Sequence, residues 1–165
     1  MRLLLLFILT ATCSSIHAQP IAPKKANKIV IQTSDDIGTA FRNFGRLLLR
    51  EGYVLEQSDA TFYFLTTEPR EMKYGISGMG KLNLKLYVQF DESENGTLIQ
   101  ITGKYASEQL FKAAGGGKDE FNFDTQGNEI LNRGGKASLT GASWIIMDEL
   151  AKALQGGSIT YEISE

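Results

Sequence analysis

Hydrophobic residues recur every three or four positions between residues 35 and 51, which is the spacing of an amphipathic helix. Gly52 follows this stretch and favours termination of the helix. A second apolar stripe spans residues 139–154 and is followed by Gly156 and Gly157. The sequence therefore predicts two helices, each with one face that packs on a core.

A strict alternation of apolar and polar residues marks positions 81–90, with leucine, valine and phenylalanine at every even position. This period of two predicts a strand that buries one face and exposes the other. Residues 97–105 are also predicted to form a strand, and Asn95 and Gly96 between the two segments are typical of a tight hairpin turn. The polar side chains of residues 81–90 are therefore expected to face water.

Shorter segments rich in β-branched and aromatic residues predict further strands at 28–33, 53–57, 61–67 and 158–163. Two glycine-rich regions separate the predicted elements and are expected to be loops, at residues 68–80 and 106–136. The second of these is long for a connection without structure of its own, which is typical of a functional or mobile segment.

The order of these elements predicts an α+β fold of two layers. An antiparallel sheet of four to five strands would carry both helices on one face and leave the other face open. Residues 28–165 form a single domain in this interpretation, because one core of this size is feasible for the chain.

The first 18 residues have the layout of a secretory signal peptide, in which Arg2 precedes an apolar run and then small residues. Residues 19–27 contain two prolines and are expected to be an extended leader. An alternative is an outer-membrane lipoprotein anchored through Cys13. The threonines at positions 10 and 12 fit a lipid attachment site poorly, so we favour the cleaved form, which is periplasmic or extracellular.

Cys13 is the only cysteine and His17 the only histidine of the chain. Both precede the expected cleavage site, so the mature domain would lack cysteine nucleophiles, histidine-based catalysis and metal sites built from these residues. We therefore expect no cofactor and no metal. The net charge of −2 gives no indication of a nucleic-acid partner, and no segment of the mature chain is long and apolar enough for a transmembrane span.

The stretch from Asp36 to Val54, followed by Asp59 and by a strand that ends at Thr67, resembles the BamC-like βαβββα domains of the bacterial envelope. The shared pattern is a helix, a Gly-Tyr or Gly-Phe pair, a polar turn and a strand. This resemblance implies an envelope location. In its overall organisation the chain looks like a small exported protein of a Bacteroidetes-type bacterium.

These observations predict a non-catalytic binding or assembly module of the cell envelope, whose partner is another envelope protein. Candidate contact residues are the polar face of residues 81–90 and the aromatic residues of the long loop, because aromatic side chains often anchor interfaces. They are Asn83, Lys85, Tyr87, Phe121 and Phe123. Packing across strands explains Tyr87 at least as well. For Phe121 and Phe123 we favour a packing role in the core beneath the loop.

Two alternatives stay open. The first is a small-molecule or lipid carrier, which would need a cavity between the helices and the sheet. The second is a small carboxylate-based hydrolase that uses Glu68 and Glu71, or Ser77 with Lys73. Paired catalytic carboxylates need a cleft and convergence from separate elements, so we favour the non-catalytic interpretation.

Overall fold

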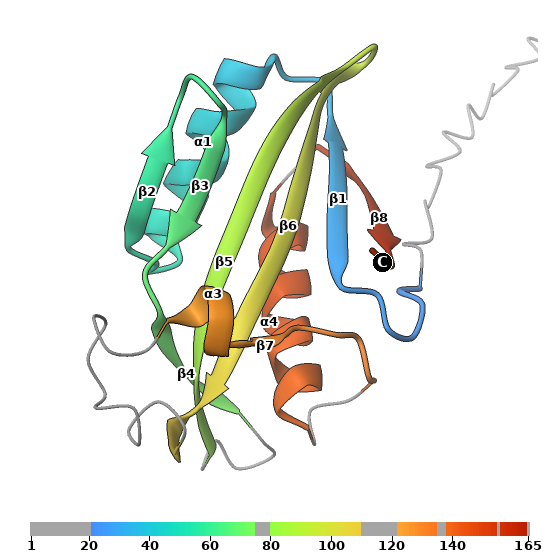
Figure 1. Cartoon of the computed structure of the whole chain (residues 1–165). Coiled ribbons are helices and arrows are strands. Elements are labelled where there is room, and N and C mark those ends of the chain that lie inside the picture. Colours follow the sequence, from blue (N-terminus) through green and yellow to red (C-terminus); the bar gives the residue numbers. More distant parts are fainter. Residues whose placement is uncertain (1–20, 75–79, 110–121, 135–137, 155, 165) are drawn as a thin grey trace, which may run out of the picture.

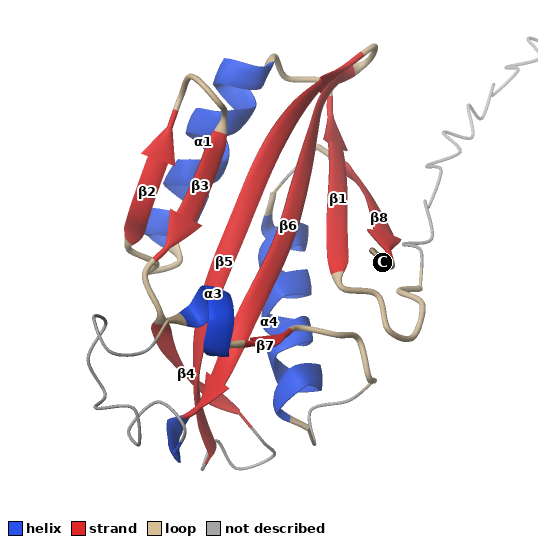
Figure 2. Ribbon diagram, viewed as in Figure 1, coloured by secondary structure: helices blue, strands red, loops and turns tan. Residues whose placement is uncertain are grey.

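The computed structural model describes residues 21–74, 80–109, 122–134, 138–154 and 156–164. Within these residues the chain forms one open antiparallel sheet together with helices (Figure 1, Figure 2). Helices α1 (Ile37–Arg50) and α4 (Leu139–Ala153) lie behind the sheet in these views, and the short helix α3 (Phe123–Gln126) lies in front of it. The mixed α+β class predicted from the sequence is confirmed.

The sheet holds eight strands in the described part of the chain. In chain order they are β1 (Lys28–Thr33), β2 (Leu55–Asp59), β3 (Phe64–Thr67), β4 (Arg70–Tyr74), β5 (Gly80–Ser93), β6 (Gly96–Ser107), β7 (Asn128–Glu129) and β8 (Ser158–Glu162).

A long hairpin of β5 and β6 forms the centre of the sheet, in the order β2-β3-β5-β6-β1-β8. These two strands have 14 and 12 residues, so each has room for two partners along its outer edge. Strand β3 and then β4 pair with β5, whereas β1 and β7 pair with β6. The hairpin therefore connects every other part of the fold.

The core lies between the sheet and the pair α1 and α4. Alternate residues of β1, β5 and β6 point toward these helices, as the period of two requires. Phe44 of α1 packs edge-to-face on Phe90 of β5, with ring centroids 6.0 Å apart, and Phe41 packs on the same ring at 5.4 Å. The largest fully buried side chains are Phe44, Ile29, Ile31, Leu48, Leu65, Leu82, Leu84, Leu86, Ile99, Ile101, Ile130 and Met147.

The sheet is richer in strands than the four to five predicted, mainly because residues expected to be loop pair with the long hairpin. Residues 70–74, within the predicted loop 68–80, form β4 against the first half of β5. Glu71 and Lys81 make an ion pair of 2.9 Å across these strands. The free edge of β5 decides this pairing, and such an edge is invisible in the local sequence of residues 70–74.

The turn between β2 and β3 lies later in the chain than predicted. Strand β2 continues to Asp59, whose carboxylate accepts hydrogen bonds from the backbone N–H groups of Thr61 (2.7 Å) and Phe62 (3.1 Å). This local capture of backbone donors by an aspartate is a usual way to form a turn. Tyr63 then adopts a positive φ of 50° and leads into β3.

The predicted signal peptide at residues 1–18 lies outside the described residues, as does Cys13. Residues 21–27, which belong to the predicted leader, are held against the domain. Backbone hydrogen bonds join Lys25 to Asn132 (2.8 Å) and Asn132 to Ala26 (2.8 Å). Among the residues that the structure describes, no helix is both long and apolar enough to cross a membrane.

Candidate functional site

The face of the sheet opposite α1 and α4 carries a hollow of about 390 Å³. We call it the sheet-face groove. It extends over four neighbouring strands, β3, β5, β6 and β1. Its lining residues are Lys28, Phe64, Leu65, Thr66, Tyr87, Val88, Gln89, Gln100 and Thr102.

Strand register brings these side chains together from distant parts of the sequence. One cross-strand row joins Phe64, Gln89 and Gln100, because Phe64 pairs with Gln89 and Gln89 with Gln100. Directly opposed residues on neighbouring strands have side chains on the same face. The groove is therefore built from this row and from the adjacent row, which contains Thr66, Tyr87, Thr102 and Lys28.

Helix α3 is fixed to the sheet next to this groove. The hydroxyl of Tyr87 donates a hydrogen bond of 2.5 Å to Oδ1 of Asp124, and Nζ of Lys104 donates to the backbone oxygen of Asp124. The side chain of Asn122 caps the helix by accepting from the N–H groups of Asp124 and Thr125. The segment around α3 thus covers the part of the sheet face beyond Tyr87 (Figure 1).

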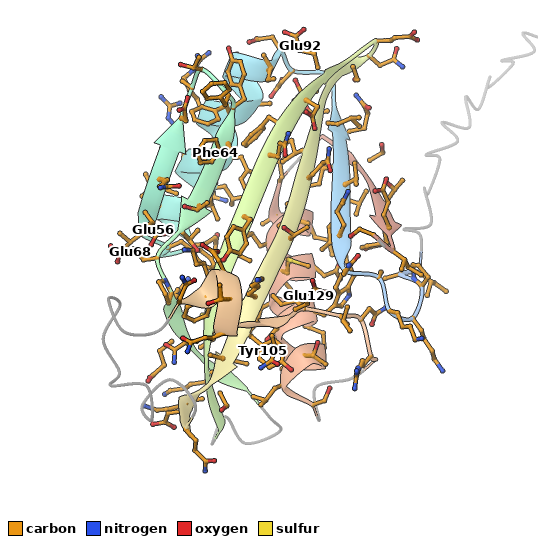
Figure 3. The ribbon with its side chains drawn as sticks, viewed as in Figure 1. Glu56, Phe64, Glu68, Glu92, Tyr105 and Glu129 are labelled. Carbon is orange, nitrogen blue, oxygen red and sulfur yellow. The ribbon has the colours of Figure 1, made fainter. Side chains whose placement is uncertain are left out.

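Two lysines stand opposite each other on this covered part, Lys85 on β5 and Lys104 on β6. Each has a negatively polarised partner: Lys85 pairs with Glu56 of β2 at 2.6 Å, and Lys104 bonds the α3 backbone. Nζ of Lys85 also lies 5.5 Å from the centre of the Tyr87 ring. Figure 3 labels Glu56 on β2. The positive charge of Lys85 is therefore compensated by a carboxylate, whereas that of Lys104 is stabilised by a backbone carbonyl oxygen.

The hydroxyl of Tyr87 has a pKa raised above its ordinary value. Burial is the largest cause, followed by the hydrogen bond to Asp124 and by the charges of Asp124 and Glu56. The phenol therefore stays protonated at neutral pH and remains the donor in its bond to Asp124. This bond fixes the orientation of the ring that borders the groove.

An aspartate orders the amide groups at the other end of the groove. Asp91 accepts hydrogen bonds from Nε2 of Gln100 (2.6 Å) and from Nε2 of Gln89 (3.4 Å). A carboxylate only accepts hydrogen bonds, so both glutamines turn their NH₂ groups toward it. Both glutamines line the groove, and among the described residues their side-chain carbonyl oxygens accept no hydrogen bond.

A smaller hollow of about 170 Å³ adjoins the first, with Tyr87 and Thr102 in the lining of both. Its other lining residues come from the end of β6, from β7 and from the two ends of the described chain. Figure 3 labels one of them, Glu129 of β7. The hollow is lined by Asn27, Tyr87, Thr102, Gly103, Lys104, Glu129, Ile130 and Ser164.

The helical side of the molecule has a hollow of about 400 Å³ as well. It lies between α1 and α4 and is lined by Asn43, Arg46, Leu47, Arg50, Ala153 and Leu154. The arginines in the last half of α1 complement the helix dipole, which gives them a structural reason to be there. We therefore take the sheet-face groove as the stronger candidate.

The predicted contact residues fall into different environments. Asn83 and Lys85 were expected to face water, but they are only 8% and 9% exposed. Lys85 is covered because its Nζ is held by Glu56 at 2.6 Å and lies 5.5 Å from the centre of the Tyr87 ring. Tyr87 is half-buried and lines the groove. Phe123 lies in α3 and is 3% exposed, whereas Phe121 lies outside the described residues.

The structure thus brings Lys85 and Tyr87 together with α3, which contains Phe123, and adds residues that the sequence interpretation missed. Gln100, Thr102 and Asp124 are the most important of these. The alternation of polar and apolar residues in the segment 97–105 could have identified Gln100 and Thr102. Once the register of the β5–β6 hairpin is known, Gln100 and Thr102 must lie on the same face as Gln89 and Tyr87.

The residues considered for catalysis lie away from the groove lining. Glu71 and Lys73 are in β4, where Glu71 forms its ion pair with Lys81. Glu68 precedes β4 (Figure 3), and Ser77 lies outside the described residues. Across the described ranges, no cluster of three or more His, Cys, Asp or Glu side chains is arranged to hold a metal ion.

Comparison of the sequence with protein-family models and with curated protein sequences found no match.

Proposed function

We propose that the chain is an exported, non-catalytic binding module of the bacterial cell envelope, which holds another envelope component in the sheet-face groove. The observation that supports this function most is the groove itself. Two helices cover one face of the sheet, while the other face presents a hollow of about 390 Å³ that is lined by side chains of four strands.

The composition of this surface supports a binding role. Phe64 and Tyr87 give it aromatic area, and Gln89, Gln100 and Thr102 give it groups that donate and accept hydrogen bonds. Binding sites commonly combine apolar area with a small number of placed polar groups. The hydrogen bonds of Tyr87 to Asp124 and of Gln100 to Asp91 also hold side chains in position before a ligand arrives, which lowers the entropic cost of binding.

Photo-crosslinking in native envelopes tests this function. p-Benzoyl-phenylalanine replaces Gln57 of β2, which is exposed and pairs with Thr66 at the rim of the groove. The matched control carries the same group in place of Leu49, which is 56% exposed on α1 on the opposite side of the sheet. We expect a crosslinked adduct from the position of Gln57 and none above background from that of Leu49.

The reverse pattern, with adducts only from the position of Leu49, would move the binding surface to the helical side and refute the proposal. Absence of adducts from both positions in intact envelopes would also count against a binding role for this face. Urea denaturation of both variants checks that each is folded before it is used.

A further inference from the structure

We infer that the sheet-face groove binds a neutral glycan, with sugar rings packed on its aromatic side chains and sugar hydroxyls bonded to its amides and hydroxyls. This inference rests on the proposed function and specifies the class of component that is bound. Three features of the groove support this inference. Its lysines are ion-paired, its strands have their backbone groups bonded to neighbouring strands, and its glutamine amides are oriented by an aspartate.

The lysines Lys28 and Lys85 at the groove are paired with carboxylates of the fold. Lys28, which lines the groove, forms an ion pair of 3.5 Å with Glu162 of β8, and Lys85 beside it pairs with Glu56. Asp91 receives hydrogen bonds from the two glutamine amides. Among the described residues that line the groove, an anionic ligand would therefore meet no unpaired lysine or arginine, and a cationic ligand would meet no carboxylate. The groove is therefore suited to a ligand without net charge.

The position of the groove disfavours an extended peptide as its ligand. Peptides that add to a sheet bind the unpaired backbone groups of an edge strand. The groove lies on β3, β5, β6 and β1, each of which has a paired strand on both sides. A ligand on this face is therefore recognised through side chains alone, because the backbone hydrogen bonds are already made between strands.

A helical peptide also fits this surface poorly. Helices dock in grooves through apolar side chains at spacings of three and four, and they need an apolar floor. Each of the two rows of this groove instead contains one aromatic residue together with amides or hydroxyls, as in Phe64, Gln89 and Gln100. A sugar ring combines many hydroxyl groups with flat C–H faces, so it complements this mixture of aromatic and polar side chains.

The chemistry of a sugar ring matches these groups one by one. Gln89 and Gln100 each present a carbonyl oxygen, and Thr102 presents a hydroxyl that both donates and accepts. The hydroxyl of Thr66 donates to Glu56 at 3.4 Å and can still accept a hydrogen bond. Vicinal sugar hydroxyls use both kinds of partner. The negative faces of the Phe64 and Tyr87 rings attract the weakly positive C–H groups of a pyranose. Asp91 acts as a positioning residue because it orients both amides.

Selective destruction of envelope components tests the ligand class. Native envelopes are treated either with proteinase K, which is then inactivated without removal of the released material, or with sodium periodate, which cleaves vicinal diols. The chain with p-benzoyl-phenylalanine in place of Gln57 is then added and irradiated. We expect the adduct to survive protease treatment and to disappear after periodate treatment.

Survival after periodate combined with loss after protease would overturn the glycan inference and make the ligand a protein, while the proposed function would stand. If no adduct forms in untreated envelopes, the proposed function itself fails. The two failures are therefore distinguishable. Adduct yield is also expected to change less than about twofold between about 0.05 and 0.5 M NaCl, because a neutral ligand gives salt little to screen. A steep loss with salt would refute neutrality.

A pair of glutamine variants distinguishes specific recognition from non-specific binding. Gln100→Ala removes an amide of the groove, and Gln32→Ala removes one from β1 outside the groove lining. We expect the first variant to lower adduct yield about tenfold, the effect of losing roughly two hydrogen bonds, and the second to leave it unchanged. Equal yields from both variants would refute the assigned role of Gln100.

Discussion

At the scale of single residues, Tyr87 links distant parts of the fold. Its ring borders both hollows of the sheet face, and its hydroxyl holds Asp124 of α3. The pattern of residues 81–90 identified Tyr87 as a residue of the polar face. The hydrogen bond of Tyr87 to α3 could not be predicted from that local pattern, because Asp124 lies 37 positions away in the chain.

Replacement of Tyr87 by phenylalanine tests this link. Tyr87→Phe keeps the ring but removes the donor to Asp124, so we expect the free energy of unfolding to fall by about 1 kcal/mol. Hydrogen exchange of the α3 amides should become faster. Urea denaturation and hydrogen-exchange mass spectrometry measure the two effects. In the control Tyr105→Phe, the lost hydroxyl has no hydrogen bond among the described residues, and neither effect is expected.

Gly96 has the most demanding backbone position of the β5–β6 hairpin. Its φ is +119°, and a Cβ atom there would lie 2.2 Å from the backbone oxygen of Thr33. Gly96→Ala should therefore lower the free energy of unfolding by about 3 kcal/mol, measured by urea denaturation. Gly134 also has a positive φ, +70°, but open space around it. Gly134→Ala should cost only about 1 kcal/mol, and equal losses would contradict this explanation.

At the scale of elements, the most informative connection runs from β7 to α4. Thr140 in the first turn of α4 uses its hydroxyl to accept from the N–H of Leu131 (2.8 Å) and to donate to the backbone oxygen of Leu131 (3.1 Å). Ile130 next to it fills the core beside Gly103 of β6. The hydroxyl of Thr140 thereby fixes the connection through which the chain passes from β7 on the sheet to α4.

Thr140→Val keeps the shape of the side chain but removes these hydrogen bonds. The N–H of Leu131 would lose its partner, so we expect a fall of about 1 to 3 kcal/mol in the free energy of unfolding. Thermal and urea denaturation measure it. Thr160→Val on the exposed edge strand β8 is the matched control, because its hydroxyl makes only a long bond of 3.4 Å. The control is expected to be nearly neutral, and a larger loss there than at Thr140 would contradict the assignment.

At the scale of the whole molecule, buried phenols couple the fold to alkaline pH. Burial raises the pKa of Tyr53 from 10 to about 12, although the nearby guanidinium of Arg70 acts in the opposite direction. The same ring lies 4.7 Å from the Arg70 guanidinium carbon. The pKa values of Tyr87 and Tyr161 are also raised, mainly by burial and then by hydrogen bonds to Asp124 and Asp148.

The sign of this coupling follows from proton binding. Between pH 10 and 12 the unfolded chain loses the Tyr53 proton before the folded chain does, so stability falls as pH rises. Below pH 10 the contribution of Tyr53 to the free energy of unfolding does not change with pH. We expect Tyr53 to account for a loss of about 2 to 3 kcal/mol across that range. Urea denaturation at several pH values measures it, and Tyr53→Phe should flatten the curve. Identical curves for the two proteins would refute the assignment.

The predictable part of the fold came from local pattern. The apolar stripes predicted α1 and α4 to within about two residues, and the alternation of residues 81–90 marked the middle of β5. Strands β1, β6 and β8 followed from residue type. Strand β4 was missed because residues 70–74 have no alternation strong enough to oppose the nearby Pro69 and the glycines after it.

The candidate site was predictable only in part for the same reason. The sequence indicated the polar face with Tyr87 and the loop with Phe123, and it treated them as separate candidates. Tertiary structure placed them side by side and covered Asn83 and Lys85. Burial of a strand residue depends on what crosses over it, and the crossing segment begins about 15 residues after β6 ends.

The sequence by itself thus determined the helices, most strands and the division of β5 into an apolar and a polar face, because these depend on neighbours within about four positions. Only the tertiary structure decided the register that aligns Phe64, Gln89 and Gln100, the pairing of β4, and the attachment of α3 to Tyr87. These features depend on contacts between residues far apart in the chain. The groove forms only because such contacts bring residues of four strands together.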